Sequence, residues 1–380
     1  MFIKLEIDRK NIEKNLKKIK KINKNIICVL KDDAYGLGIR NILPILIENG
    51  CHYFAVAYME EAMEIRRIIK KKYLEKEKQI SVMTLNFIDK KYIEKAVKND
   101  IEITLFSIQQ LCSYSEIFRK IGRKNFIKLH IKLNTGMNRL GFDENEIDIL
   151  TEKIAEMKKE NTKIEIKSVY SHVSDSEDIR ETKLQIEKYE NIMIKLKESK
   201  LECGNKKIYK HIQASPLLFR YGTEYNYDFA RIGMAIYGME PLSECIGLES
   251  TVKLTSRVIN IRNVKKGEKV SYGQNGTVNE DSKIGVVPIG YAHGLRKQIE
   301  NSDSYVLIKG QKAYILGEVC MDMIIVDVTD IANVNVGDEV VIIGKQGEKE
   351  ITLLEMAKWA YTIQDDILTG LNKSIRRTVR

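Results

Sequence analysis

Residues 29–38 of this chain read VLKDDAYGLG, and they continue an apolar run at residues 25–30 that has the composition of a short buried strand. The strand leads into Lys31, and Tyr35 and two glycines follow. Burial at a strand end removes water from a lysine and favours its neutral, nucleophilic amine. The glycines permit a tight turn, and a tyrosine hydroxyl can bind an anion. The pattern favours a pyridoxal phosphate (PLP) site, with Lys31 on the aldehyde and Tyr35 on the phosphate.

Apolar runs of the same kind recur along the chain up to about residue 240, each followed by a longer charged segment with helical spacing. The runs lie at residues 53–57, 80–85, 101–105, 127–133 and 164–170. In the first charged segment, isoleucines and a leucine repeat every three or four residues from Ile12 to Ile22, and Asp8 precedes them as a candidate N-cap. Repeated strand–helix units predict a (β/α)8 barrel over residues 1–240.

The sequence changes character after Pro241. Strand-like segments at residues 252–261, 283–289, 305–308, 324–328 and 339–343 are separated by Gly, Asn and Asp, and no long helix is predicted before residues 353–371. Residues 241–380 are therefore predicted to form a mostly-β second domain. An alternating segment at residues 2–7 precedes the barrel pattern, and we expect residues 1–8 to pair with this second domain.

Composition narrows the possible partners and compartment. The chain has 380 residues and is 43% hydrophobic, with no apolar run long enough for a membrane span and no signal-peptide core at its start. Its 6 cysteines have neither paired nor metal-like spacing, so reduced thiols, no metal and a cytoplasmic location are expected. The net charge of +10 invites a nucleic-acid interpretation. Lysines and arginines alternate with glutamates on helical faces, as at residues 60–70, which favours a solvated surface and no nucleic-acid partner.

The segment at residues 127–133 places Lys128, His130 and Lys132 on one face of a strand. Barrel strands are normally covered on both faces, so a polar face points to a site or to a polar barrel interior. A polar loop at residues 134–139 follows, where barrel enzymes carry functional groups. The alternative is a solvated edge strand.

Histidine, serine and arginine residues follow later strands. His172 and His211 are candidates for stacking on an aromatic ring or for purely structural hydrogen bonds, and Ser215 has a hydroxyl that can bind phosphate. The backbone N–H groups of Gly233 and Met234 are further candidates for contacts with phosphate oxygens. An arginine stays protonated, so Arg231 facing the pyridine nitrogen of PLP would leave that nitrogen unprotonated and the cofactor a weaker electron sink.

Several segments of the chain resemble the alanine racemase family and occur in that family's order. They are residues 29–38, 132–141, 172, 231–241, 270–273, 290–292 and 320–322. The resemblance spans nearly the whole chain. The family fold is a (β/α)8 barrel followed by a β domain, in agreement with the pattern above. The resemblance implies a PLP-dependent isomerase that interconverts L- and D-alanine, with serine as a possible second substrate. Its D-amino acids would supply peptidoglycan synthesis.

The resemblance also implies roles for individual residues. Lys31 would hold the cofactor covalently and act as base on the D side, and Tyr272 would act as base on the L side in the active site of a partner subunit, which makes a homodimer expected. Contacts to the cofactor would come from Tyr35, His172, Ser215, Arg231, Gly233, Met234 and Asn372, with His211 behind Arg231. Substrate contacts and access would involve Arg139, Tyr291, Met321 and Asp322, and Lys132 matches a lysine that is often carbamylated.

One departure from the family concerns the substrate. Residues 371–376 align with a stretch that carries a tyrosine on the phosphate, and Asn372 takes its place. A smaller polar residue leaves room for a hydroxymethyl side chain, as in the racemase domain of the VanT-type serine racemases, which carry a membrane domain that this chain lacks. Serine as the main substrate is thus one alternative. The others are a non-catalytic PLP carrier, which would resemble only the first domain, and a PLP-dependent decarboxylase, for which Arg231 is the wrong partner.

Overall fold

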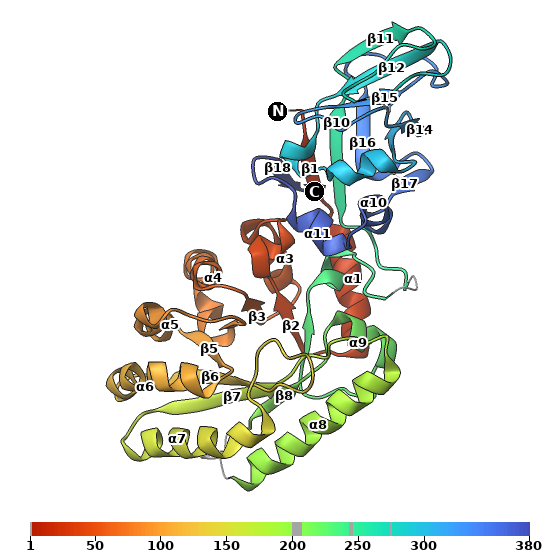
Figure 1. Cartoon of the computed structure of the whole chain (residues 1–380). Coiled ribbons are helices and arrows are strands. Elements are labelled where there is room, and N and C mark those ends of the chain that lie inside the picture. The colour runs from red at the N-terminus through yellow and green to blue at the C-terminus, as the bar shows by residue number, and fades with distance from the viewer. Residues whose placement is uncertain (1, 200–206, 243–245, 274–275) are drawn as a thin grey trace.

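The computed structural model describes residues 2–199, 207–242, 246–273 and 276–380, which form a barrel and a separate body of β-sheets (Figure 1). The barrel sheet has 8 strands in the order β8-β7-β6-β5-β4-β3-β2-β9, all parallel, and an isolated bridge between Ala214 and Arg231 joins its ends. The predicted (β/α)8 barrel is confirmed. Its strands are β2 (Ile26–Val29), β3 (Tyr53–Val56), β4 (Ser81–Thr84), β5 (Ile101–Leu105), β6 (Ile127–Lys132), β7 (Ile164–Tyr170), β8 (Tyr209–His211) and β9 (Ala230–Ile232).

Amphipathic helices cover the outside of this barrel. In the first of them, Ile12, Leu16 and Ile19 are buried, and the side chain of Asp8 accepts a hydrogen bond from the backbone N–H of Asn11 at 2.9 Å as its N-cap. The covering helices are α1 (Arg9–Ile22), α3 (Ile39–Glu48), α4 (Met59–Lys72), α5 (Ile93–Lys98), α6 (Ile108–Gly122), α7 (Ile147–Lys159), α8 (Ile179–Glu198) and α9 (Ser215–Tyr221). Short 3-10 turns lie at Leu74–Gln79, Lys90–Tyr92, Glu144–Glu146, Met234–Tyr237, Tyr291–His293 and Lys297–Asn301.

Strand β6 carries its polar residues into the barrel. It is hydrogen-bonded to β5 on one side and to β7 on the other, so the alternative of a solvated edge strand is wrong. His130 and Lys132 are buried, whereas Lys128 is half-buried and pairs with Asp100 at 2.6 Å.

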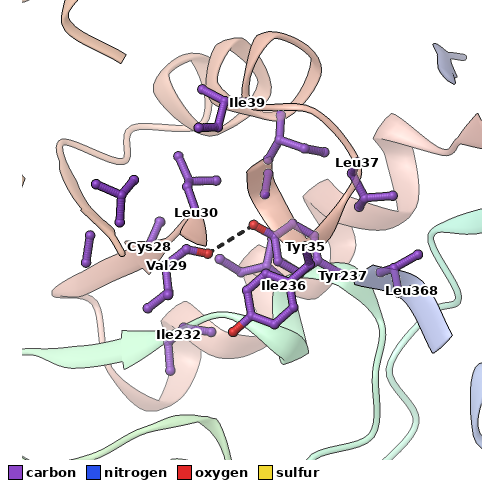
Figure 2. Close-up of a cluster of buried hydrophobic side chains, with 14 of the residues drawn as sticks. Cys28, Val29, Leu30, Tyr35, Leu37, Ile39, Ile232, Ile236, Tyr237 and Leu368 are labelled. Atoms are coloured by element: carbon purple, nitrogen blue, oxygen red, sulfur yellow. Dashed lines mark hydrogen bonds between the residues drawn. The ribbon is translucent and has the colours of Figure 1, made fainter. Parts of the chain in front are cut away.

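The turn after β2 has an unusual conformation. In α2 (Lys31–Tyr35), the four residues from Asp32 to Tyr35 have φ between 55° and 56°, which makes a left-handed turn of non-glycine residues. Such residues cost about 1–2 kcal/mol each. Backbone hydrogen bonds from Ala34 to Leu30 at 2.9 Å and from Gly36 to Asp32 at 2.9 Å hold the turn, and the Tyr35 side chain is buried against apolar neighbours (Figure 2). The sequence predicted a glycine turn but not this left-handed segment.

The second body contains a sheet in the order β14-β13-β16-β10-β1-β18, with β17 on β16, and a smaller sheet β11-β12-β15. The N-terminal strand β1 pairs antiparallel with β10 and parallel with β18, so the first strand of the chain lies between two late ones. The strands are β1 (Lys4–Ile7), β10 (Val252–Arg257), β11 (Asn260–Val264), β12 (Ser282–Val287), β13 (Tyr305–Ile308), β14 (Gln311–Tyr314), β15 (Ile324–Asp327), β16 (Glu339–Gln346), β17 (Lys349–Ile351) and β18 (Arg376–Val379).

Two expectations for this half of the chain are wrong in detail. Residues 252–261 form two strands because the chain leaves the large sheet after β10 and enters the small sheet as β11. Residues 353–371 form two short helices, α10 (Leu353–Trp359) and α11 (Gln364–Thr369), because Tyr361 adopts a left-handed φ of 52° that ends the first. Of the helices in the described ranges, none is long and apolar enough to cross a membrane.

Candidate active site

A cavity of about 450 Å³ lies at the carboxyl ends of the barrel strands. Parallel barrel strands bring these ends to one face, so residues far apart in sequence meet there. Residues predicted for the site that line this cavity are Lys31, Tyr35, Lys132, Arg139, His172, Ser215, Arg231, Gly233 and Met234. A second cavity of about 460 Å³ lies between α1 and the β domain, and in the described chain it is lined by none of these residues. We assign the site to the first cavity because the reactive groups converge there.

Lys31 and Tyr35 come from the left-handed turn after β2. Lys31 is half-buried, with its Nζ 5.7 Å from the centroid of the Tyr35 ring. The Tyr35 ring packs 4.9 Å from that of Tyr237, whose hydroxyl donates to the carbonyl of Val29 at 3.0 Å (Figure 2). Burial raises the pKa of Tyr35, and the charges of Asp365 and Asp32 raise it further, so the hydroxyl stays protonated and can donate a hydrogen bond.

Gly233 follows β9 and lies against the Tyr35 hydroxyl. A Cβ at this position would collide with that hydroxyl, so no side chain fits without moving the tyrosine. Gly233 and Met234 both line the cavity, and Gly233 has no side chain that could cover its own backbone there. Ser215, the first residue of α9, lines the cavity together with them. This set of hydroxyl and N–H donors suits a phosphate group.

Arg231 is buried and fixed by hydrogen bonds from its two terminal nitrogens. Nη1 donates to His211 Nδ1 at 2.8 Å and to the His211 carbonyl at 3.1 Å. Nη2 donates to His172 Nδ1 at 3.1 Å and to the carbonyls of Ser171 at 2.6 Å and Ile212 at 3.2 Å. Burial lowers the pKa of Arg231 to about 10, so it remains charged near neutral pH. Its Nε makes no hydrogen bond within the described residues, which leaves one N–H for a ligand in the cavity.

The two histidines beside Arg231 are neutral. Burial lowers the pKa of His172, and the neighbouring cations, Arg231 first, lower it further. The same causes lower the pKa of His211, which also stacks on Tyr170 with ring centroids 4.8 Å apart and an interplanar angle of 13°. Both Nδ1 atoms can therefore accept from the guanidinium, as the distances require.

Lys132 lies among cations. Its Nζ donates to the carbonyl of Leu140 at 3.0 Å and lies 5.8 Å from the centroid of the Tyr170 ring. Burial lowers the pKa of Lys132 to about 7, with added repulsion from Arg231 and Arg139. Much of this amine is therefore neutral and nucleophilic near pH 7.

The predicted residues of the β domain do not reach this cavity within the described chain. The side chains of Tyr272, Met321 and Tyr291 are 68%, 55% and 42% exposed. Asp322 and Asn372 are exposed as well, and the Asn372 amide donates to the Ala292 carbonyl at 2.9 Å. Hydrogen bonds tie the loops together, from Ser271 Oγ to the Glu318 carbonyl at 2.6 Å and from Ala292 N to the Met321 carbonyl at 3.0 Å. The five residues thus belong to one exposed loop cluster.

Tyr170, Ser168 and Glu102 were missed by the sequence reasoning. Tyr170 lines the cavity, and its ring centroid lies 5.1 Å from the guanidinium carbon of Arg231. Ser168 and Glu102 lie deeper in the barrel, both buried. Ser168 and Tyr170 alternate along β7 with outward residues, and that period of two was the available signal. Within the described ranges, no group of histidine, cysteine, aspartate and glutamate residues could hold a metal ion.

Comparisons with known proteins agree with this geometry. The model of the family described as "Alanine racemase, N-terminal domain" matches residues 7–241, and that of "Alanine racemase, C-terminal domain" matches residues 251–379. Alanine racemase 2 of Caldanaerobacter subterraneus subsp. tengcongensis is 31% identical over 98% of this chain and 94% of its own length. The solved alanine racemase of Clostridium difficile 630 has a TM-score of 0.85 at 28% identity and covers 100% of this chain and 96% of its own. That of Bartonella henselae, with covalently bound pyridoxal phosphate, has a TM-score of 0.87 at 26% identity over 100% of both chains.

Proposed function

Because this chain belongs to the alanine racemase family, a family of PLP-dependent isomerases, we propose that it interconverts L- and D-alanine with two bases on opposite faces of the substrate. The observation that carries this proposal is the convergence of Lys31, Tyr35 and Arg231 on one cavity at the carboxyl ends of the barrel strands. The predicted family and cofactor are confirmed. The two-base mechanism, the site residues and the second substrate are proposals.

The cavity residues fit PLP. Lys31 would hold it covalently, while Tyr35, Ser215 and the backbone at Gly233 and Met234 would bind its phosphate. The free Nε–H of Arg231 would donate to the pyridine nitrogen. Bound PLP stabilises negative charge at the substrate Cα. Because an arginine does not give up its proton, it would leave the pyridine nitrogen unprotonated, which limits this stabilisation and favours return of the proton over side reactions.

We propose that Lys132 is carbamylated. Its partly neutral amine can react with carbon dioxide, and the product carries a negative charge beside Arg231 and Arg139. In this reaction the amine nitrogen forms a bond to the carbon of carbon dioxide and releases a proton to water, which converts repulsion among three cations into attraction. Arg139, thus oriented, would lie by the phenolic oxygen of the cofactor.

We propose that the second base comes from a partner subunit of a homodimer. The loop cluster of Tyr272, Tyr291, Met321, Asp322 and Asn372 is exposed and lies outside the cavity of its own chain. A tyrosine on such a loop can serve as base only in another chain's site, where His172 and Arg231 would favour its phenolate. The backbone N–H of Met321, next to Asp322, would bind the substrate carboxylate there, and Tyr291 would line the access channel.

The test is hydrogen exchange at the substrate Cα in D2O, together with racemisation, for the PLP-loaded enzyme. Tyr272→Phe should lose racemisation by at least about 100-fold, since general bases contribute roughly 10²–10⁴-fold. It should still exchange the Cα hydrogen of D-alanine, which faces Lys31, but not that of L-alanine. Tyr361→Phe, at a tyrosine that is 76% exposed in the same domain, is the matched control and should behave as the wild type.

Two alternative functions predict different results. A non-catalytic PLP carrier predicts unchanged rates in Tyr272→Phe, and a decarboxylase predicts release of carbon dioxide from lysine or ornithine. Absence of alanine and serine racemisation in the loaded wild type would refute the proposal.

Serine is the second proposed substrate, with Asn372 as the residue that permits it. The Asn372 side chain is tied to the Ala292 carbonyl beside Tyr291, so it would act on substrate at the subunit interface. Asn372→Tyr should reduce kcat/KM for L-serine more than for L-alanine, and an equal loss for both would remove Asn372 as a specificity residue. The VanT-type likeness, the peptidoglycan role and the cytoplasmic location stay predictions.

A further inference from the structure

A continuous chain of buried hydrogen bonds runs through the barrel interior from Arg231 to Glu102. Arg231 Nη1 lies 2.8 Å from His211 Nδ1, and His211 Nε2 lies 2.8 Å from Ser168 Oγ. Ser168 Oγ lies 2.7 Å from His130 Nδ1, and His130 Nε2 lies 2.9 Å from Glu102 Oε2. The five side chains come from β9, β8, β7, β6 and β5, and all are buried.

The two ends of the chain fix its direction. Arg231 can only donate, because a guanidinium has no acceptor. Burial raises the pKa of Glu102, but the hydrogen bonds from His130 and Tyr53 and the charge of Lys167 lower it. The carboxylate is therefore ionised and can only accept. Tyr53 donates to the same oxygen at 2.8 Å.

With His130 and His211 both neutral, only one arrangement of protons satisfies every link. His211 accepts from Arg231 at Nδ1, so its ring proton lies on Nε2 and points to Ser168. The Ser168 hydroxyl then donates to His130 Nδ1, and the His130 proton lies on Nε2 and points to Glu102. In the reverse direction Ser168 would donate to His211 Nε2, and His211 would need two acceptor nitrogens, which a neutral imidazole does not have.

We propose that Glu102 is a positioning residue for Arg231: acting through His130 and Ser168, it reinforces the His211 tautomer that accepts from the guanidinium. The guanidinium is thereby oriented with its free Nε–H toward the cavity. The catalytic part of this inference rests on the proposed function, in which that N–H meets the pyridine nitrogen. Glu102 does not line the cavity, so the proposed effect on Arg231 passes through the hydrogen-bonded rings.

The decisive variant is Glu102→Gln, which keeps the shape and removes the charge. The glutamine amide can donate to His130 Nε2 and so permit the reverse direction, in which His211 Nδ1–H opposes Arg231 Nη1–H. The readout is the tautomer of each ring, measured by ¹⁵N–¹H correlation NMR on PLP-loaded enzyme labelled at its 5 histidines. Signals are assigned with the substitutions His52→Gln, His172→Gln and His293→Gln.

We expect a single Nε2–H tautomer for His130 and His211 in the wild type, and loss of that single state at His211 in Glu102→Gln. The kcat for alanine should fall by about tenfold with little change in KM, within the range known for coupled hydrogen-bond networks. Tyr53→Phe is the matched control: it removes the other donor to Glu102 but no link of the chain, so His211 should be unchanged.

Ser168→Ala tests whether the effect of Glu102 passes through Ser168, because it removes the hydroxyl between His130 and His211 and keeps the charge of Glu102. Glu102→Gln added to Ser168→Ala should cause no further change at His211 or in kcat. An unchanged His211 tautomer in Glu102→Gln, or fully additive effects in the double variant, would overturn the proposal. Should Glu102→Gln not fold, Ser168→Ala alone must alter the His211 tautomer. A wild type that racemises nothing would overturn the proposed function, while the NMR spectra would still test the chain.

Discussion

Gly233 lies against Tyr35 in the site, and Gly233→Ala tests whether this contact shapes the site. A Cβ at residue 233 would lie 2.9 Å from Cζ of Tyr35 and collide with its hydroxyl. Tyr35 cannot retreat freely, because it is buried and its ring packs 4.9 Å from that of Tyr237. Overpacking of this kind costs about 1–3 kcal/mol of stability.

The same substitution should weaken PLP binding. If the Tyr35 hydroxyl is displaced, a hydrogen bond to a charged phosphate is lost, which is worth about 1.5–3 kcal/mol. The Kd for PLP should therefore rise roughly 10- to 150-fold, since each 1.4 kcal/mol is about tenfold. Fluorescence titration of the apoenzyme with PLP measures the Kd, and urea unfolding measures the stability.

Gly285→Ala is the matched control. This glycine lies in β12, and its new Cβ would meet Val328 at 3.4 Å and Val326 at 3.5 Å, which are ordinary contacts that leave the site untouched. Its stability should change by no more than about 0.5 kcal/mol, with no change in PLP affinity. If Gly233→Ala matched Gly285→Ala in both measurements, the proposed role of the Gly233–Tyr35 contact would be wrong.

Two further predictions concern stability. Burial lowers the pKa of Lys132 from its ordinary 10.5 to about 7, so the unfolded chain binds more protons between these values. The free energy of unfolding of carbonate-free apoenzyme should therefore rise with pH from about 7 toward 10.5. Urea titrations at pH 7 and 9 measure this rise, and Lys132→Met should remove it. An equal rise in the wild type and in Lys132→Met would contradict the lowered pKa of Lys132. Asp8→Ala removes the cap of α1 and should cost about 1 kcal/mol by urea unfolding, whereas no change would show that water replaces the cap.

The sequence supported the barrel and most of its site for one physical reason. Apolar runs of strand length that alternate with amphipathic helices require a parallel sheet, and a parallel sheet places all carboxyl strand ends on one face. Residues directly after a strand, such as Lys31, His172 and Gly233, were therefore predictable as neighbours without knowledge of any loop. Tyr272 and Met321 lie on turns of an antiparallel domain, where no such rule sets their position relative to the barrel.

Two features could not be predicted, for different reasons. The left-handed turn from Asp32 to Tyr35 is imposed by tertiary packing of Tyr35, against the local preference of non-glycine residues. Glu102 lies in an apolar run that is buried on both faces, so period-two alternation does not reveal which residue faces inward. Its partner His130 is on the next strand, where the register pairs it with Thr104, and Glu102 is the diagonal neighbour two residues before Thr104.

The charge of the cavity wall connects these observations. Asp32 is the one acidic residue among the described residues that line the cavity. The basic residues there are Lys31, Lys132, Arg139 and Arg231. Burial first, and then the repulsion among these cations, lowers the pKa values of Lys132 and His172. A phosphate-bearing cofactor brings the opposite charge to the place where it is lacking. At a PLP concentration of 100 times its Kd, binding would raise the free energy of unfolding by about 2.7 kcal/mol. Bound PLP would thus reduce the repulsion among the basic residues of the cavity and stabilise the fold.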